Sequence, residues 1–207
     1  RPQVLLLDEP LSALDLKIRL EMEEELRRVH RETGATFVYV THDQREALAL
    51  SDRVAVFDRG RVEQIAPPSD LYRNPTSVFA ARFVGDANVI PVEVTAGGGP
   101  GTTVSVAGRE LAIPTLDQAP AGPAWLVLRP EAINVVQSVP AGFGSLDGVV
   151  EDVAFRGTGY TYRLSVEGVA ERIKAEIAAG AAGPAELGAP VVIAWDPASC
   201  RLLPRES

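Results

Sequence analysis

Glycine and proline are distributed very unevenly along this chain of 207 residues. Residues 1–86 contain 8 of them (3 Gly and 5 Pro), whereas residues 87–207 contain 26 (15 Gly and 11 Pro). Both residue types interrupt helices, while short strands joined by tight turns use them freely. The sequence therefore predicts two domains, an α/β segment at residues 1–86 and an all-β segment at residues 87–207.

Composition excludes several classes of protein. The single cysteine, Cys200, cannot form an internal disulfide, which fits a reducing compartment. The formal net charge is −8, and both segments are acidic, which argues against nucleic-acid binding. No apolar run approaches the roughly 18 residues of a membrane-spanning helix, and we expect no signal segment. The histidines His30 and His42 give no zinc-like ligand spacing with one cysteine.

The first segment begins with a strand–helix–strand pattern. Val4–Leu7 is a continuous apolar run, which is typical of a strand covered on both faces in a parallel sheet. Ser12 and Asp15 have the spacing of a capping box with Ser12 as the cap, and the following helix is expected to stop at Gly34. Thr36–Thr41 predicts a second strand, which completes a βαβ unit.

Several shorter elements are expected between this unit and residue 86. They are a helix, the two strands of a hairpin and two further helices, at Gln44–Leu50, Arg53–Phe57, Arg61–Ile65, Ser69–Arg73 and Thr76–Val84. The hairpin is favoured because Gly60 follows Asp58 at the spacing of a tight turn. Asn74 and Pro75 separate the last two helices.

The second segment contains eight short runs of β character. They are Val89–Val94, Thr102–Val106, Glu110–Ile113, Trp125–Arg129, Gly148–Phe155, Tyr160–Val166, Arg172–Ile177 and Val191–Trp195. Many short strands at this spacing predict a small barrel or sandwich. The glycine-rich stretch Ala96–Gly101 is expected to be a hairpin tip and not a phosphate-binding loop, because no Lys-Ser or Lys-Thr follows it.

Aromatic and arginine side chains in this segment have simple structural interpretations. The aromatic residues on the expected strands are predicted to be core rather than a ligand platform: Trp125, Phe155, Tyr160, Tyr162 and Trp195. Arg129, Arg156 and Arg163 are interpreted as scattered surface residues, with a small anion site as the alternative.

Three side chains with catalytic potential follow the two expected parallel strands. Asp8 and Glu9 come directly after the first strand, and His42 comes after the second. Ligands of parallel sheets bind outside the carboxyl ends of the strands, where these residues would meet. One carboxylate could hold Mg²⁺, the next could deprotonate water, and the imidazole could donate a hydrogen bond to a phosphate. Taken singly, each residue is equally explained as an ordinary loop or cap residue.

The order of these residues resembles a known family. Leu5 to Asp15 looks like the Walker B motif and D-loop of an ABC transporter ATPase, and Thr41 to Arg53 looks like its switch-histidine region. Gly60 to Gly85 resembles the exit segment of importer ATPases that carry a C-terminal TOBE domain, an OB-type barrel. In the tail, Asn88–Pro91, Leu128–Glu131 and Val191–Trp195 resemble that domain. The implied fold is an α/β remnant of a P-loop ABC ATPase followed by an all-β OB-type (TOBE) barrel.

The resemblance implies a role for each motif residue. Asp8 would help to hold the Mg²⁺ of Mg-ATP through water, Glu9 would be the general base, and His42 would contact the γ-phosphate. Ser12 and Asp15, in the D-loop, would lie at the interface with a second ATPase subunit. The implied partners are this second subunit in a homodimer, membrane-spanning permease subunits and, indirectly, a periplasmic or extracellular binding protein, with the chain peripheral to the cytoplasmic face of the bacterial plasma membrane.

Three family motifs are absent from the 207 residues. There is no G-x-x-x-x-G-K-[ST] phosphate loop and no Leu-Ser-Gly-Gly signature, and the family's Gln loop is absent too, so the resemblance is to the back part of a longer ATPase. We therefore expect this chain alone to be inactive, and we expect residues 1–85 to be poorly ordered or covered by self-association.

The sequence is compatible with more than one class of function. The leading one is the ATP-hydrolysing, energy-coupling subunit of an importer, and Arg156 to Arg163 most resembles polyamine or ferric-ion importers. The alternative is a non-catalytic regulatory or dimerisation module. A soluble ABC ATPase of DNA repair or translation is disfavoured by the β-rich tail.

Overall fold

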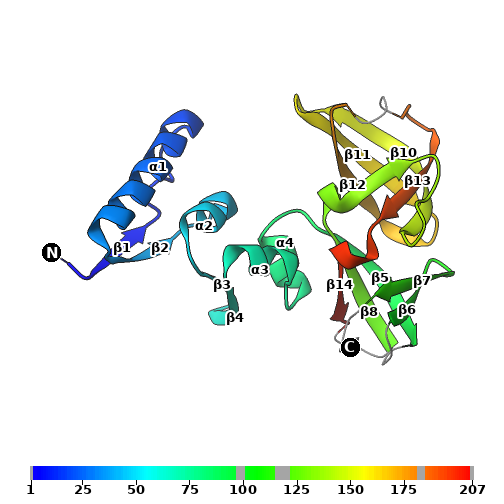
Figure 1. The fold of residues 1–207 in the computed structure, drawn as a ribbon, viewed down its shortest axis with the longest axis horizontal. Coiled ribbons are helices and arrows are strands. Elements are labelled where there is room, and N and C mark those ends of the chain that lie inside the picture. Colours follow the sequence, from blue (N-terminus) through cyan, green and yellow to red (C-terminus); the bar gives the residue numbers. More distant parts are fainter. Residues whose placement is uncertain (1, 97–100, 115–121, 181–184, 206–207) are drawn as a thin grey trace. The chain divides into compact units, whose positions relative to one another are not determined.

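The chain forms two compact units, which are described separately here (Figure 1). The computed structural model describes residues 2–96, 101–114, 122–180 and 185–205. The first unit comprises Arg1–Asn74 and Phe83–Gly85, and the second comprises Pro75–Arg82 and Asp86–Ser207. Contacts therefore place residues 75–82, which precede the expected boundary after residue 86, with the β-rich part of the chain.

The βαβ unit predicted from the sequence is confirmed. Strand β1 (Val4–Asp8) pairs in parallel with β2 (Thr36–Val40), and helix α1 (Leu16–Thr33) connects them. The helix ends at Gly34, whose φ of 63° lies in the left-handed region that glycine adopts at low cost. Because the register is in step, Asp8 at the end of β1 lies opposite Val40 at the end of β2.

The predicted cap of α1 is wrong. Asp15, not Ser12, is the N-cap, and its carboxylate accepts hydrogen bonds from the backbone N–H groups of Lys17 and Ile18. The hydroxyl of Ser12 instead donates to the backbone oxygen of Glu9 at 2.9 Å. Both residue types are good caps, so the competing backbone acceptor at Glu9 decides which one takes the role.

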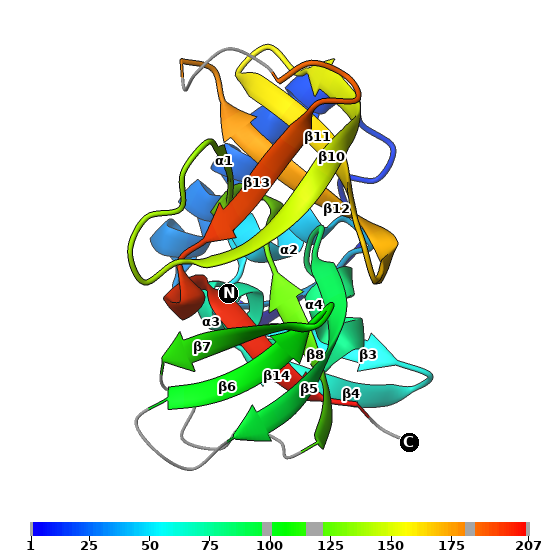
Figure 2. The same ribbon diagram turned by 90° about the vertical axis from the view of Figure 1, so that its right-hand side faces the viewer.

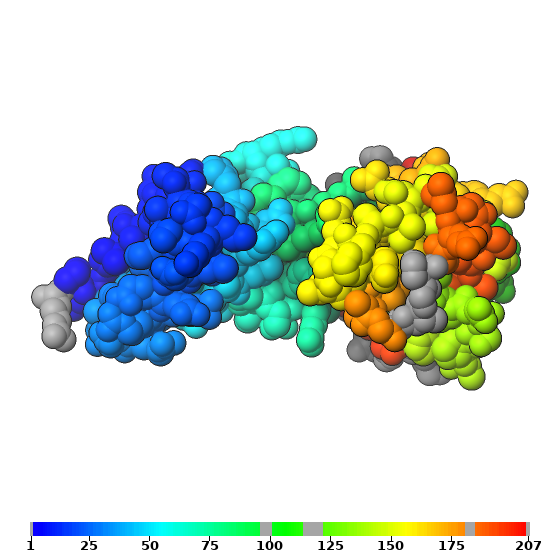
Figure 3. All heavy atoms as spheres, turned by 90° about the horizontal axis from the view of Figure 1, so that it is seen from above, coloured from blue at the N-terminus to red at the C-terminus, as the bar shows by residue number. Residues whose placement is uncertain are grey.

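The prediction that the first strand is covered on both faces is also wrong. Leu5 and Leu7 are half-buried, whereas Leu6 is 73% exposed and Val4 and Val38 are exposed beside it. The sheet has two strands and one connecting helix, so only one of its faces is covered. Side chains of α1 (blue) also lie at the surface of the first unit in Figure 3.

The remainder of the first unit is built around a confirmed hairpin. Helix α2 (Gln44–Leu50) is followed by antiparallel strands β3 (Val54–Asp58) and β4 (Arg61–Ala66) and by helix α3 (Pro68–Arg73). A small core joins these elements through Val54, Val56, Leu71 and Val84.

In its described residues, the second unit contains two five-stranded antiparallel sheets, and most of their strands can be followed in Figure 2. The first sheet has the order β14-β8-β5-β6-β7, and its strands are β5 (Asn88–Ala96), β6 (Gly101–Val106), β7 (Arg109–Pro114), β8 (Gly122–Leu128) and β14 (Cys200–Pro204). The second has the order β12-β11-β10-β13-β9, and its strands are β9 (Ile133–Val136), β10 (Gly144–Phe155), β11 (Gly159–Val166), β12 (Val169–Ala178) and β13 (Pro190–Trp195). Single 3₁₀ turns occur at Pro130–Ala132 and Pro197–Ser199.

The predicted all-β fold is confirmed, although β9 and β14 were not anticipated. Four expected residues of the hairpin tip at Ala96–Gly101, residues 97–100, lie outside the described residues. One continuous apolar core is formed by side chains of both sheets. Its largest member is Trp195, which packs so closely on Gly144 that a Cβ there would lie 2.7 Å from the indole atom Cε2.

The prediction that the aromatic residues belong to the core is confirmed for some of them and wrong for one. Trp195 and Tyr162 are buried in the core, as expected, and Trp125 and Tyr160 are half-buried. Phe155 is 62% exposed, so its assignment to the core is wrong. The reason is that Phe155 is the last residue of β10, where the sheet has run past the core; its ring lies 5.2 Å from that of Tyr160, between centroids.

The outer face of the first sheet carries helix α4 (Val78–Phe83). Ala81 is fully buried against Val89, Val127 and Leu203, which form a second small core. Arg129 is 7% exposed, and its Nη1 donates to the backbone oxygens of Ala81 at 2.8 Å and Asp86 at 3.0 Å. The interpretation of Arg129 as a surface residue is therefore wrong, because its guanidinium binds the carbonyls at the end of α4.

Candidate functional site

Glu9 and His42 meet at the carboxyl edge of the β1–β2 sheet. Their side chains are 3.0 Å apart between Nε2 of His42 and Oε1 of Glu9. The backbone N–H of Glu9 also donates to the oxygen of Val40 at 2.8 Å, which extends the parallel ladder past the end of β1. The prediction that the carboxylate of Glu9 and the imidazole of His42 lie close together is thus confirmed, although this contact does not test their roles.

Both side chains are open to solvent, and the backbone at Glu9 is unusual. The side chain of His42 is 87% exposed and that of Glu9 is 41% exposed. Glu9 has a φ of 44°, in the left-handed region that few residues other than glycine adopt. Such conformations cost about 1–3 kcal/mol and tend to occur at functional sites. The turn after β1 therefore presents the carboxylate of Glu9 to solvent at an energetic cost.

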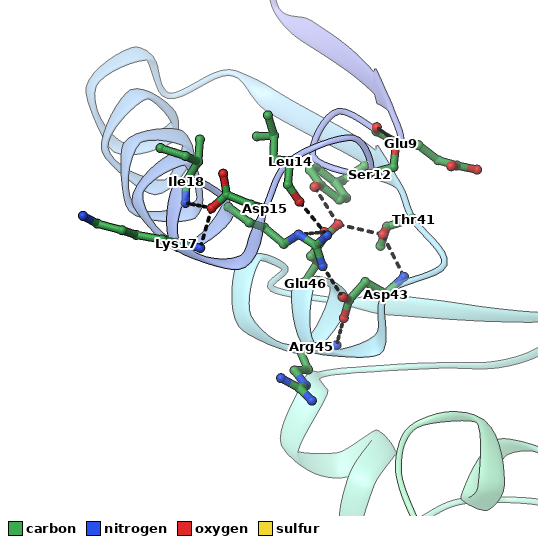
Figure 4. A network of polar contacts seen from close by, with 12 residues as sticks. Glu9, Ser12, Leu14, Asp15, Lys17, Ile18, Thr41, Asp43, Arg45 and Glu46 are labelled. Carbon is green, nitrogen blue, oxygen red and sulfur yellow. Dashed lines mark hydrogen bonds and ion pairs between the residues drawn. The ribbon is translucent and has the colours of Figure 1, made fainter.

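The loop from Ser12 to Asp15 lies beside this turn, as Figure 4 shows. Ser12 bonds to the Glu9 carbonyl through both its hydroxyl and its backbone N–H, and Asp15 caps α1. Leu11, which directly precedes Ser12, is 2% exposed and anchors the start of the loop. Glu9, Ser12 and Asp15 consequently lie along one continuous segment after β1, and His42 contacts this segment from the end of β2.

A polar network that the sequence analysis did not anticipate continues from this loop (Figure 4). Glu46 is 2% exposed, and its Oε2 accepts hydrogen bonds from the hydroxyls of Tyr39 at 2.9 Å and Thr41 at 2.7 Å. Arg19 pairs with Asp43 at 3.1 Å and approaches Glu46 at 3.8 Å. Burial, together with the hydrogen bond to the Glu46 carboxylate, raises the pKa of the Tyr39 hydroxyl. None of these contacts was predicted from the sequence.

The donor set at this edge was tested for its fit to Mg²⁺. Within the described ranges, no three His, Cys, Asp or Glu side chains gather as a metal site. Mg²⁺ bound with a nucleotide uses one or two carboxylates, phosphate oxygens and water, and the exposed Asp8 carboxylate fits that limited requirement.

Comparison with known proteins was made for the whole chain. A family model described as the TOBE domain matches residues 126–203, which include every strand of the second sheet. Among solved structures, the molybdate-bound form of the cytoplasmic molybdate-binding protein ModG matches with a TM-score of 0.48 and 18% identity, over 56% of this chain and 96% of that one. No conclusion is drawn from a similarity of that size.

Curated relatives cover both units. A spermidine/putrescine import ATP-binding protein of Frankia alni is 42% identical over 99% of this chain and 47% of its own length. A protein of the same name from Pseudomonas fluorescens is 40% identical over 98% of this chain and 56% of its own length. An Fe(3+) ions import ATP-binding protein of Brucella abortus is 42% identical over 80% of this chain and 46% of its own length.

The relatives match this chain over most of its length. It matches the C-terminal part of ABC importer ATP-binding subunits, and it spans about half the length of the relatives. In the described part of the chain, no helix combines the length and apolar character that crossing a membrane requires.

Proposed function

We propose that this chain supplies the catalytic-carboxylate and switch-histidine part of an ATP-hydrolysing, energy-coupling subunit of an ABC importer. The observation that carries the proposal is the 3.0 Å contact between Glu9 and His42 at the edge where two parallel strands end. The similarity of nearly the whole chain to import ATP-binding proteins supports it.

The chemistry assigned to each side chain follows from its position. Glu9, with an exposed carboxylate held in a fixed turn, accepts a proton from the water that attacks the γ-phosphate. His42 donates a hydrogen bond to that phosphate and, through its contact with Glu9, keeps the base next to the phosphate. Asp8 is the residue that would hold Mg²⁺, which neutralises phosphate charge when bound.

The partners follow from the same proposal. Ser12 and Asp15 lie on the exposed turn beside Glu9 and form the surface that meets a second ATPase subunit in a homodimer. Permease subunits in the membrane receive the resulting motion, with a binding protein acting indirectly, and the chain is peripheral to the cytoplasmic face. Relatives named for spermidine/putrescine and for Fe(3+) ions support a polyamine or ferric ion as cargo.

The second candidate is a non-catalytic regulatory or dimerisation module. It is favoured by the absence of a G-x-x-x-x-G-K-[ST] motif from these 207 residues and by the TOBE match at residues 126–203. Under this alternative, Glu9 and His42 form a docking surface and no reaction depends on them.

The decisive experiment supplies the missing phosphate loop. A chimera joins the N-terminal part of the Pseudomonas fluorescens relative to this chain, and Mg²⁺-dependent phosphate release is measured. Glu9→Gln should lower kcat by about 10²-fold or more, with little change in KM for ATP. The matched control is Glu21→Gln, at an exposed carboxylate on α1, which should leave kcat unchanged. Unaltered turnover in the Glu9 variant would decide for the non-catalytic module.

The second measurement is ATP hydrolysis by the 207-residue chain alone. We expect no ATP hydrolysis from it, because no phosphate loop is present to bind the β- and γ-phosphates. Phosphate release that disappears in Glu9→Gln would contradict this expectation.

A further inference from the structure

The side chain of His42 has little packing of its own to hold it. It is 87% exposed, so its position depends on the backbone around it. That backbone is held by a local turn, in which the N–H of Asp43 donates to the hydroxyl of Thr41 at 2.9 Å, across His42. Whatever holds Thr41 and Asp43 therefore sets the position of the imidazole.

Two partners hold these flanking residues. The Thr41 hydroxyl donates to Glu46 at 2.7 Å, and the Glu46 side chain is 3% exposed. Asp43 caps helix α2 by accepting from the N–H of Arg45 at 2.8 Å, while its second oxygen pairs with Arg19 at 3.1 Å. The His42 turn is thus attached to α2 and, through Arg19, to helix α1.

Arg19 also binds the loop that precedes its own helix. Its Nη2 donates to the backbone oxygen of Leu14 at 3.0 Å, while its Nη1 binds Asp43. Leu14 directly precedes Asp15, the N-cap of α1. One planar guanidinium thereby links the Ser12–Asp15 loop to the His42 turn, a geometry that a single ammonium group cannot reproduce.

Arg19 supplies positive charge to two carboxylates at this link. Asp43 and the buried Glu46 are both carboxylates that face the guanidinium, at 3.1 Å and 3.8 Å. A buried carboxylate is costly unless a cation and hydrogen-bond donors surround it. Loss of Arg19 would leave two acidic groups facing each other next to His42, which would push the turn toward solvent.

We propose that Arg19 is a positioning residue that joins the Ser12–Asp15 loop and the His42 turn into one rigid body. For catalysis this inference rests on the proposed function, whereas the link itself is independent of it. In a homodimer whose second subunit touches the Ser12–Asp15 loop, displacement of that loop would reach the His42 turn through Arg19, in addition to the path through Ser12 and Glu9.

The first test concerns the link alone and uses the 207-residue chain without nucleotide. NMR order parameters of the backbone amides of His42 and Leu14 are compared in wild type, Arg19→Met and Arg27→Met. In Arg19→Met, we expect both values to fall from about 0.85 to below about 0.6. Arg27 is the matched control, because it is on the same helix and pairs with Glu23 at 3.9 Å, away from both loops.

A second variant separates positioning from helix stability. Asp43→Asn keeps a good N-cap for α2 but removes the ion pair with Arg19, so α1 retains its own contacts. It should raise the mobility of His42 to a similar extent. Unchanged order parameters in both Arg19→Met and Asp43→Asn would overturn the proposal, and so would an equal effect of Arg27→Met.

The catalytic arm uses the chimera described above. Arg19→Met should lower kcat by about 10-fold to 10²-fold with a change in KM for ATP of less than about 3-fold, because only geometry at the γ-phosphate is altered. Arg19→Lys should recover only part of the loss. If the unmutated chimera has no activity, the proposed function fails while the NMR result still decides the link. Full activity in Arg19→Met would refute the catalytic part.

Discussion

Asn88 provides the sharpest test of how the second unit is held together. Strand β12 is at the edge of its sheet, so one side of its backbone has no strand partner. The side-chain amide of Asn88, from β5 in the other sheet, takes that place. Its Oδ1 accepts from the N–H of Lys174 at 2.7 Å, and its Nδ2 donates to the oxygen of the same residue at 2.9 Å and to Leu128 at 3.3 Å.

The expected cost of Asn88→Ala follows from these contacts. Two short hydrogen bonds are lost, each contributing about 0.5–1.5 kcal/mol, and the long contact with Leu128 contributes less. Lys174 is partly exposed, so water can reach its freed backbone groups and limit the penalty of leaving them unpaired. We expect the free energy of unfolding to fall by about 2–3 kcal/mol, which corresponds to a Tm lower by roughly 8–12 °C.

The measurement is urea unfolding followed by tryptophan fluorescence. The only two tryptophans, Trp125 and Trp195, are both in the second unit, so the signal reports on that unit. Asn134→Ala is the control, because Asn134 is an exposed asparagine on β9 and its loss should change stability by less than about 0.5 kcal/mol. Equal effects of the two variants, or a loss below about 0.5 kcal/mol for Asn88→Ala, would refute the edge-pairing argument.

Two further predictions concern buried polar groups of the second unit. Burial raises the pKa of the Cys200 thiol to about 12, so at pH 8.5, where an unfolded thiol is about half ionised, the folded protein should resist alkylation by iodoacetamide. Because the pKa of this thiol is higher in the folded than in the unfolded state, the thiol stabilises the fold below its usual pKa, and that contribution is lost as the pH rises toward 12. Labelling that mass spectrometry finds equally fast with and without urea would contradict the argument. Arg129→Met should lower the free energy of unfolding by about 2–3 kcal/mol, since a charged donor to Ala81 and Asp86 is lost, whereas Arg156→Met, at an exposed position, should have almost no effect in the same urea titration.

Local sequence signals were sufficient for the parallel strand pair and therefore for the contact between Glu9 and His42. The apolar run in β1, the left-handed stop at Gly34 and the strand that follows leave one compact arrangement, a parallel pair with its carboxyl ends together. Residues immediately after those ends must then be neighbours, and Glu9 and His42 are.

The predictions from sequence were wrong where a polar side chain had more than one possible hydrogen-bond partner. Ser12 and Asp15 are equally good caps by type, and the choice depends on the position of the Glu9 carbonyl, which is fixed only by the turn. Arg129 has no local feature that separates it from surface arginines, because its partners are carbonyls more than forty residues earlier in the sequence. Periodicity and spacing describe a residue's own element and contain no information about such distant acceptors.

At the candidate site too, some residues can be identified from a local motif, whereas others are placed by contacts between distant elements. Residues that would touch a nucleotide are exposed and near strand ends, so a motif identifies them. Glu46 and Arg19, which hold the surrounding turns, are placed by contacts among α1, α2 and β2, and no short pattern contains them both. Because His42 has little packing of its own, a change at the buried Glu46 should displace the imidazole more than a change on its exposed neighbours. Positional accuracy at this edge therefore depends on residues that the ligand never contacts.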